Sequence, residues 1–299
     1  HNTAILGILG IGKSCLAYEL IKKVSEKNIK IVCIDITNEY KKELRPYLTN
    51  DAIISDDENA FNSINANYDY IHTEGTGSMI KEHPDKSGNL AKYKTAINKD
   101  LCNFLFGHDV IPEGNAFEAT KKVRIYNLDY HKASKGEKMG FKVITSDLTQ
   151  AEKTRIVAEE LFKILMKIPL EQEKKAKVLL VFEEAHSLIP EWNSVASEGD
   201  KNATNGTAKV ILQGRKYGLG SLVITQRTAN VSKSILNQCN TIFALRVFDD
   251  TGKGFLENYI GKDYADTLAT LEERHAIAIG KGLRLKQPVI IQLNDRENI

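Results

Sequence analysis

The amino end of the chain contains the stretch Gly7-Ile8-Leu9-Gly10-Ile11-Gly12-Lys13-Ser14, which decides the fold. It fits the pattern G-x-x-x-x-G-K-[ST], in which glycines let successive backbone N–H groups turn toward phosphate oxygens. The pattern assigns Lys13 to the β- and γ-phosphates of a nucleotide and the Ser14 hydroxyl to Mg²⁺. We therefore predict a phosphate-binding loop, with nucleotide contacts from Gly7, Leu9, Gly10, Ile11, Gly12, Lys13, Ser14 and Cys15.

The segments beside this loop predict alternating strands and helices. The run Thr3-Ala4-Ile5-Leu6 directly before the loop is typical of a short buried strand. Residues 13–27 show helical apolar spacing, and 29–34 form a second strand-like run that ends at Asp35. Strand, glycine loop, helix and strand make a βαβ unit, so we predict an α/β fold with a central, mostly parallel sheet.

The rest of the chain supplies further elements of such a sheet. Thr149 and Glu152 form a capping box that opens a helix to about residue 167. The continuous apolar run 178–182 is typical of a central strand covered on both faces. Further strands are predicted at 123–128, 219–225, 241–247, 276–279 and 289–293.

Three stretches lack a clear strand pattern. We interpret 50–120 as a partly helical insertion, helical over 90–106, between two parts of the core, 1–49 and 121–299. Residues 193–207 are rich in Ser, Asn and Gly and are predicted to form a mobile loop. A loop with Lys132, Lys135, Lys138 and Lys142 is either a solvated loop or a patch that faces DNA.

Two acids end the predicted central strand. Glu183 and Glu184 come directly after 178–182, and ligands of open α/β sheets lie outside such strand ends. We assign Glu183 to Mg²⁺ and Glu184 to the attacking water, because consecutive strand residues point in opposite directions. Asp35 and Glu39 either approach the same site or cap the next helix. His186 is interpreted as a structural hydrogen-bonding residue.

A second polar group frames the predicted strand 219–225. Gln226 follows this strand, where an amide can sense the γ-phosphate or position water, or can serve as a structural cap. Arg215 precedes it and can supply charge to a transferring phosphoryl group, often in a neighbouring subunit's site, or can form a surface ion pair.

Composition excludes several classes of protein. The 299 residues hold 41 Lys and Arg against 39 Asp and Glu, so a polybasic tail is not the main means of finding a partner. Hydrophobic content of 42% excludes a largely disordered chain. Neither a membrane-spanning run nor a signal peptide is apparent, and the four cysteines form no Cys-x-x-Cys pair. We expect a cytoplasmic protein without a membrane partner.

These motifs in this order resemble the HerA branch of the HerA/FtsK family of hexameric, P-loop, DNA-translocating ATPases. The resemblance rests on the loop 7–14, Ile34-Asp35-Ile36-Thr37-Asn38-Glu39-Tyr40, Glu183-Glu184-Ala185-His186, Gly214-Arg215-Lys216-Tyr217-Gly218, Ile224-Thr225-Gln226-Arg227 and the closing segment 273–290. Asn38 stands where the family usually has glycine. The resemblance implies a RecA-like sheet, ATP and Mg²⁺ as cofactors, a homohexameric ring and double-stranded DNA in its pore.

The resemblance also implies site roles and partners. Lys13 and Ser14 correspond to the nucleotide-binding pair, Glu183 and Glu184 to the paired acids, Gln226 to the sensor and Arg215 to a finger acting on the neighbouring subunit. The expected partner is a nuclease or other effector, such as a NurA-like nuclease or a sirtuin-type NADase, in phage defence or DNA end processing. Family members begin with a small β-barrel, which we expect to be absent from this chain.

Two alternatives remain at this level. One is an ATP-binding scaffold ring that assembles and regulates an effector enzyme. The other is a conjugation- or secretion-type ATPase of the same superfamily.

Overall fold

The protein is described from a computed structural model. Its described residues are 1–55, 69–72, 86–114, 116–128, 135–138, 141–145, 148–170, 175–191, 198–283 and 285–299. Lys132 and residues 193–197 lie outside them.

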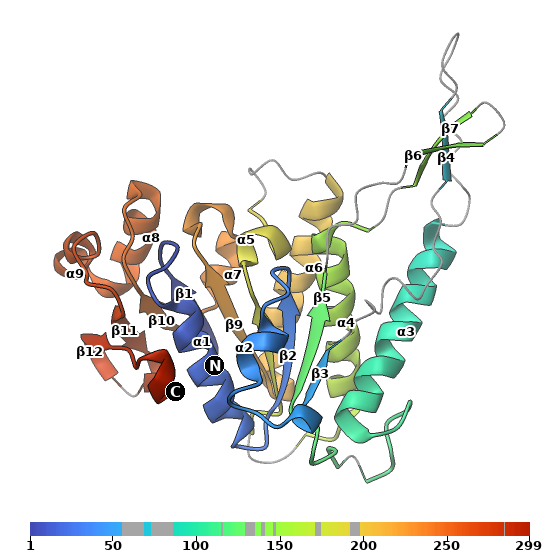
Figure 1. Ribbon diagram of the computed structural model, residues 1–299, viewed down its shortest axis with the longest axis horizontal. Coiled ribbons are helices and arrows are strands. Elements are labelled where there is room, and N and C mark those ends of the chain that lie inside the picture. The colour runs from blue at the N-terminus through green and yellow to red at the C-terminus, as the bar shows by residue number, and fades with distance from the viewer. Residues whose placement is uncertain are drawn as a thin grey trace.

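A nine-stranded sheet runs through the centre of the molecule (Figure 1). Seven neighbouring strands are parallel, and the two at one edge, β11 and β12, run antiparallel to their neighbours. The order in space is β12 (Leu285–Gln292), β11 (His275–Gly280), β10 (Thr241–Ala244), β1 (Asn2–Leu6), β9 (Leu219–Thr225), β8 (Val178–Phe182), β2 (Lys30–Asp35), β5 (Val123–Asn127) and β3 (Ile53–Ser55). The predicted α/β fold with a mostly parallel sheet is therefore confirmed.

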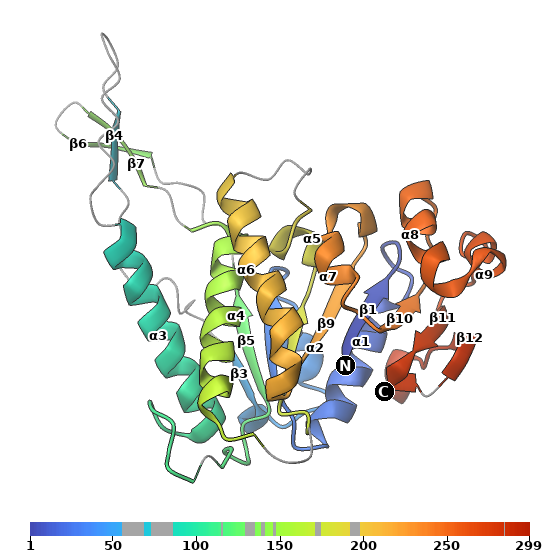
Figure 2. The ribbon, with the colours of Figure 1, turned by 180° about the vertical axis from the view of Figure 1, so that it is seen from behind.

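Helices cover both faces of this sheet (Figures 1 and 2). One face carries α1 (Lys13–Ser25) and α2 (Tyr40–Leu44). The other carries α3 (Lys86–Phe106), α4 (Gln150–Lys167), α5 (Ala185–Leu188), α6 (Glu198–Gly214) and α7 (Lys233–Leu236), and α8 (Asp250–Ile260) and α9 (Lys262–Thr267) follow beside β10 and β11. Along β2, Ile31 and Cys33 join one apolar cluster and Val32 and Ile34 join the other. Both faces of the strand are thus apolar, which is why it reads as a continuous hydrophobic run.

The region 50–120 adds an edge strand to the sheet and a helix to the apolar core. Its strand β3 pairs with β5, and the predicted helix is present as α3, whose Ile97, Leu101 and Leu105 are fully buried. Strand β4 (Asp69–His72) lies in a separate antiparallel sheet with β6 (Lys135–Lys138) and β7 (Phe141–Thr145). The prediction of a loop in the lysine-rich segment was therefore wrong for Lys135, Lys138 and Lys142, which lie in the antiparallel strands β6 and β7.

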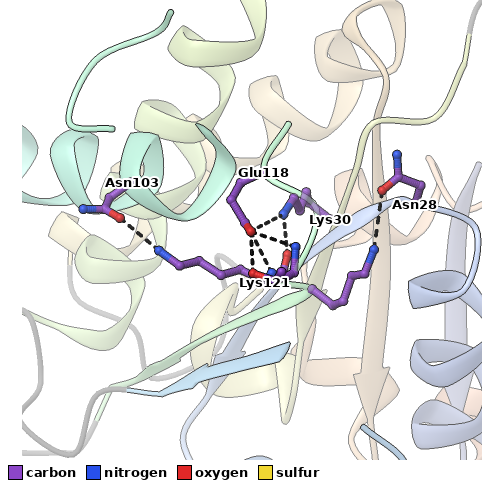
Figure 3. Close-up of polar contacts among 7 residues, drawn as sticks. Asn28, Lys30, Asn103, Glu118 and Lys121 are labelled. Atoms are coloured by element: carbon purple, nitrogen blue, oxygen red, sulfur yellow. Dashed lines mark hydrogen bonds and ion pairs between the residues drawn. The ribbon is translucent and has the colours of Figure 1, made fainter. Parts of the chain in front are cut away.

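A buried lysine fixes the end of this region to the sheet (Figure 3). Lys30, at the start of β2, is 1% exposed and lies 3.4 Å from Glu118 Oε2, and it also donates to the carbonyl of Lys121. Burial lowers the pKa of Lys30 to about 8, although the charge of Glu118 acts in the opposite direction. Lys121 Nζ in turn donates to Asn103 Oδ1 of α3 at 3.1 Å. These contacts join α3, the segment after it and β2.

Two other boundaries differ from the sequence prediction. Residues 198–207 were expected to be a loop but form the first part of α6. Small side chains in this segment, including Ala203 and Thr207, are buried, and Gly206 leaves room for the side chain of Arg155 on α4. The polar, small-residue composition thus reflects close helix packing. Strand β10 ends at Ala244, earlier than predicted, and the next residue, Leu245, is buried beside Gly7 of the loop.

Candidate nucleotide-binding and hydrolysis site

The predicted phosphate loop joins β1 to α1. Gly10 and Gly12 have φ values of 76° and 107°, a region that residues with a Cβ rarely adopt, so glycine is required at both places. Ile11 is 4% exposed and packs into the core, which anchors the loop, whereas Leu9 at its tip is 78% exposed. Arg274, beside β11, donates its backbone N–H to Ile11 O at 3.1 Å. The loop is thus fixed at its base and open at its tip.

Lys13 lies within the loop. Its side chain is buried, and Nζ donates to the carbonyl of Ile8 at 2.6 Å. Burial lowers the pKa of the Lys13 ammonium, while the negative charges of Glu184 and Glu183 act in the opposite direction. The cation of the loop therefore interacts electrostatically with both acids. Ser14 and Cys15 follow in the first turn of α1, and both are half-buried.

The strand order brings the other predicted residues to the carboxyl ends of the strands next to the phosphate loop. Strand β9 lies between β1 and β8, with Leu6 paired to Thr225 and Phe182 paired to Val223. Gln226 follows β9 and therefore lies between the phosphate loop, which follows β1, and the paired acids, which follow β8. Its side chain is half-buried. Gly7 N donates to Thr225 O at 3.4 Å, which ties the loop to the end of β9.

Glu183 is buried and held by a hydrogen bond. Its side chain is 7% exposed, and Oε2 accepts from Tyr40 Oη at 2.6 Å. Burial raises the pKa of Glu183 to about 7; the hydrogen bond from Tyr40 opposes this, the charges of Glu184 and Asp35 add to it, and Lys13 opposes it. Tyr40 was quoted in the sequence only as part of a motif. Its contact with Glu183 spans 143 positions, so no local pattern could have revealed it.

Glu184 differs from its neighbour in conformation and contacts. Its backbone has φ 50° and ψ 53°, a left-handed conformation that ends β8 abruptly and starts α5. The Oε2 atom is buried, lies 3.2 Å from His186 Nδ1, and has no hydrogen bond of good geometry to any atom of the described residues. His186 Nδ1 is also 3.5 Å from Thr225 Oγ1. The site thus holds a buried carboxylate oxygen that a ligand could satisfy.

Asp35 caps the turn after β2. Its Oδ1 accepts from the backbone and hydroxyl of Thr37 at 2.8 and 2.7 Å, and Oδ2 accepts from Tyr40 N at 3.0 Å. Both alternatives left open describe this residue, because Asp35 accepts from the first residue of α2 and its charge also raises the pKa of Glu183. Asn38 has φ 58°, which explains why glycine or asparagine suits this position. Glu39 is exposed at the start of α2.

Arg215 lies at the amino end of the central strand β9, whereas the phosphate loop of its own chain lies at the carboxyl ends of the parallel strands. It begins the short 3₁₀ helix Arg215–Tyr217, directly before β9, and is exposed. Strand β9 is parallel to β1 and has seven residues, a length of roughly 20 Å. Arg215 therefore cannot reach the loop of its own chain.

Mg²⁺ fits the groups present at the site. Such a site usually takes one or two protein oxygens and completes its coordination with phosphates and water. Among the described residues no cluster of three or more His, Cys, Asp and Glu could hold a metal by itself. Ser14 and Glu183 each offer an oxygen ligand, and Glu184 Oε2 is a buried oxygen without a hydrogen bond of good geometry among the described residues. The donor set suits a metal that arrives with a nucleotide.

This sheet order, with a phosphate loop after one strand and paired acids two strands away, defines a P-loop NTPase with a RecA-like α/β fold. The chain belongs to the family of the HerA helicase central domain, whose family model matches residues 1–253.

Individual relatives agree with this assignment. The DNA double-strand break repair helicase HerA of Sulfolobus acidocaldarius is 26% identical over 235 residues, which cover 76% of this chain and 41% of the relative. The protein of the same name from Pyrococcus furiosus is 28% identical over 120 residues, covering 39% of this chain and 20% of that protein. The chain thus spans less than half the length of these relatives.

Solved structures share the fold. VirB4 of Thermoanaerobacter pseudethanolicus has a TM-score of 0.54 at 13% identity, covering 98% of this chain and 89% of that one. The genome packaging NTPase B204 of Sulfolobus turreted icosahedral virus 2, in complex with AMPPCP, has a TM-score of 0.52 at 12% identity, covering 97% and 96%. In the described part of this chain, no helix has both the length and the apolarity needed to cross a bilayer.

Proposed function

We propose that this chain is the nucleotide-hydrolysing core of an ATP-driven motor that moves double-stranded DNA. One observation supports the proposal: the strand order brings Lys13, Glu183 and Glu184 to the carboxyl ends of the central strands, where their charges interact. There Glu184 Oε2 is buried and makes no hydrogen bond of good geometry among the described residues, with His186 Nδ1 3.2 Å away. A cation within a loop of backbone amides, opposite two acids, suits a triphosphate and the water that attacks it.

The residues divide the chemistry between them. Backbone amides of residues 7–15 and Lys13 bind the phosphates, and Ser14 and Glu183 hold Mg²⁺. When bound, Mg²⁺ neutralises charge on the β- and γ-phosphate oxygens. Glu184, whose Oε2 makes no hydrogen bond of good geometry among the described residues, takes the proton of the attacking water. Gln226, between the loop and the acids, senses the γ-phosphate.

A second subunit completes the site in this proposal. Arg215 is exposed at the amino end of β9, so any nucleotide that its guanidinium serves belongs to a neighbouring subunit. A head-to-tail arrangement of identical chains, closed into a ring, would present each Arg215 to the next loop. We propose a homohexamer of this kind, in line with the family membership.

The partners follow from the relatives. Proteins of this family are named as DNA double-strand break repair helicases, which supports duplex DNA as the substrate moved through the ring. A nuclease or another effector, such as a NurA-like nuclease or a sirtuin-type NADase, would act with the motor in DNA end processing or phage defence. The protein would work in the cytoplasm.

ATP hydrolysis measured with and without duplex DNA tests this function. A motor should hydrolyse ATP faster when duplex DNA is present. The variant Lys13→Ala should abolish ATP hydrolysis both with and without DNA. A rate of ATP hydrolysis that does not change when DNA is added, together with nucleotide-dependent binding of an effector, would instead favour a scaffold ring.

A further inference from the structure

The turn between β2 and α2 holds one of the two acids in place. Tyr40, the first residue of α2, has a fully buried side chain, and its hydroxyl donates to Glu183 Oε2 at 2.6 Å. The ring of Tyr18 from α1 packs against it edge-on, with ring centroids 5.2 Å apart and planes at 75°. In Figure 1, α2 lies beside the end of β2, over the face that α1 also covers. The packing of the Tyr40 ring therefore fixes the position from which its hydroxyl reaches Glu183.

The backbone of this turn is fixed as tightly as the ring. The carboxylate of Asp35, 1% exposed, accepts hydrogen bonds from Thr37 through one oxygen and from Tyr40 N through the other. Asp35 ends β2, and β2 pairs with β8 so that Glu183 N donates to Ile34 O at 3.1 Å. The turn that carries Tyr40 follows β2, and Glu183 follows β8, the strand paired with β2. Their contact depends on the geometry of the sheet and on the Asp35 turn.

The second acid lacks a hydrogen bond of this kind, and its polar neighbour is His186, with Nδ1 3.2 Å from Glu184 Oε2. Glu184 Oε2 has no hydrogen bond of good geometry within the described part of the chain, whereas Glu183 Oε2 accepts from Tyr40. The two adjacent carboxylates therefore differ in their hydrogen bonds. One is oriented by a neutral donor, and the other keeps an oxygen for a ligand.

We propose that Tyr40 is a positioning residue for hydrolysis: its hydroxyl holds the Glu183 carboxylate in the orientation that supports Mg²⁺-nucleotide, and it leaves Glu184 as the acid that serves the water. This inference rests on the proposed function of the site and names a residue that the function had not used. Asp35 acts one step further away, because it fixes the start of the helix that carries Tyr40.

A double-mutant cycle separates positioning from packing. Tyr40→Phe removes only the hydroxyl, and Glu183→Gln removes the charge that it orients. We expect Tyr40→Phe to lower kcat about tenfold, the usual effect of losing a hydrogen bond to a charged group, with KM within about twofold of wild type. In the Glu183→Gln background, Tyr40→Phe should have no further effect, because the two residues act as a unit.

Binding of ATPγS gives a readout that does not depend on turnover. Wild type should bind it more tightly with Mg²⁺ than with EDTA. Tyr40→Phe should reduce that gain and leave the affinity in EDTA unchanged, since the phosphate loop is intact.

Tyr126→Phe is the matched control. Tyr126 is also buried, 1% exposed, and its hydroxyl donates to a carboxylate, Asp100 Oδ2 at 2.5 Å, between β5 and α3. It should change thermal stability without changing kcat or the gain from Mg²⁺. Equal losses of kcat in Tyr40→Phe and Tyr126→Phe, additive effects in the cycle, or an unchanged Mg²⁺ gain in Tyr40→Phe would overturn the positioning role. A wild type that binds no ATPγS would instead overturn the proposed function.

Discussion

Replacing Glu183 by glutamine should change how stability depends on pH. The substitution keeps the shape of the side chain and removes its ability to ionise. In the folded protein, burial raises the pKa of Glu183 from 4.5 to about 7, and only the hydrogen bond from Tyr40 and the charge of Lys13 work against this. In the unfolded chain the carboxyl group has its ordinary pKa. The folded state therefore binds the proton more tightly than the unfolded state does.

The sign and size of the effect follow from that difference. The stability that the protonated carboxyl contributes is fully present below the unfolded pKa and is lost as the pH rises through the folded pKa. A rise from 4.5 to about 7 corresponds to about 3 kcal/mol in the free energy of unfolding. Between about pH 4.5 and about pH 8, wild type should lose roughly this amount relative to Glu183→Gln.

Urea unfolding over this pH range, in EDTA and without nucleotide, measures the difference. Glu118→Gln is a useful control, because burial pushes the pKa of Glu118 up but hydrogen bonds from Thr120 and Lys121 outweigh it and hold the pKa at about 2. The stability that Glu118 contributes is lost only as the pH falls toward about 2. Because the charge of Glu118 also raises the pKa of Lys30, the Glu118→Gln curve should run nearly parallel to wild type only between about pH 4.5 and about pH 6, below the range in which Lys30 titrates. A parallel curve for Glu183→Gln would refute the claim that burial raises the pKa of Glu183.

Further predictions concern the second acid, the trans arginine and a helix cap. Glu184→Gln should leave ATPγS affinity intact and lower the rate of ATP hydrolysis by about 10²–10⁴; wild-type turnover would place the base elsewhere. Arg215→Ala should hydrolyse ATP slowly, and mixing it with Lys13→Ala should restore activity in hybrid sites, whereas strictly additive rates would argue against action in trans. Thr149→Ala removes the capping box of α4 and should cost about 1–2 kcal/mol of unfolding free energy in urea titrations; an unchanged midpoint would show that the cap contributes nothing.

The parts of the site that local sequence encodes could be predicted. The loop 7–14 needs glycine where φ is positive, and β8 needs apolar residues on both faces, so each leaves a readable pattern. The capping box at Thr149 is likewise local, and it is confirmed with both of its hydrogen bonds.

The parts that depend on long-range packing could not be predicted. The small residues of α6 look like a loop until α4 is placed against them, because close helix packing and loop composition favour the same residue types. Tyr40 meets Glu183 only through the pairing of β2 with β8. The place of Gln226 between the loop and the acids likewise depends on β9 inserting between β1 and β8, an order that no local pattern specifies.

Equilibrium binding of ATPγS to Lys13→Ala tests the central claim most directly. Lys23→Ala is the matched control, because Lys23 lies on the same helix, is 62% exposed and pairs with Glu19. Wild type and Lys23→Ala should bind with equal affinity, and Lys13→Ala should lose at least about 100-fold, since the phosphates lose their buried cation. Equal affinity in all three proteins would contradict the account of this loop as the triphosphate site.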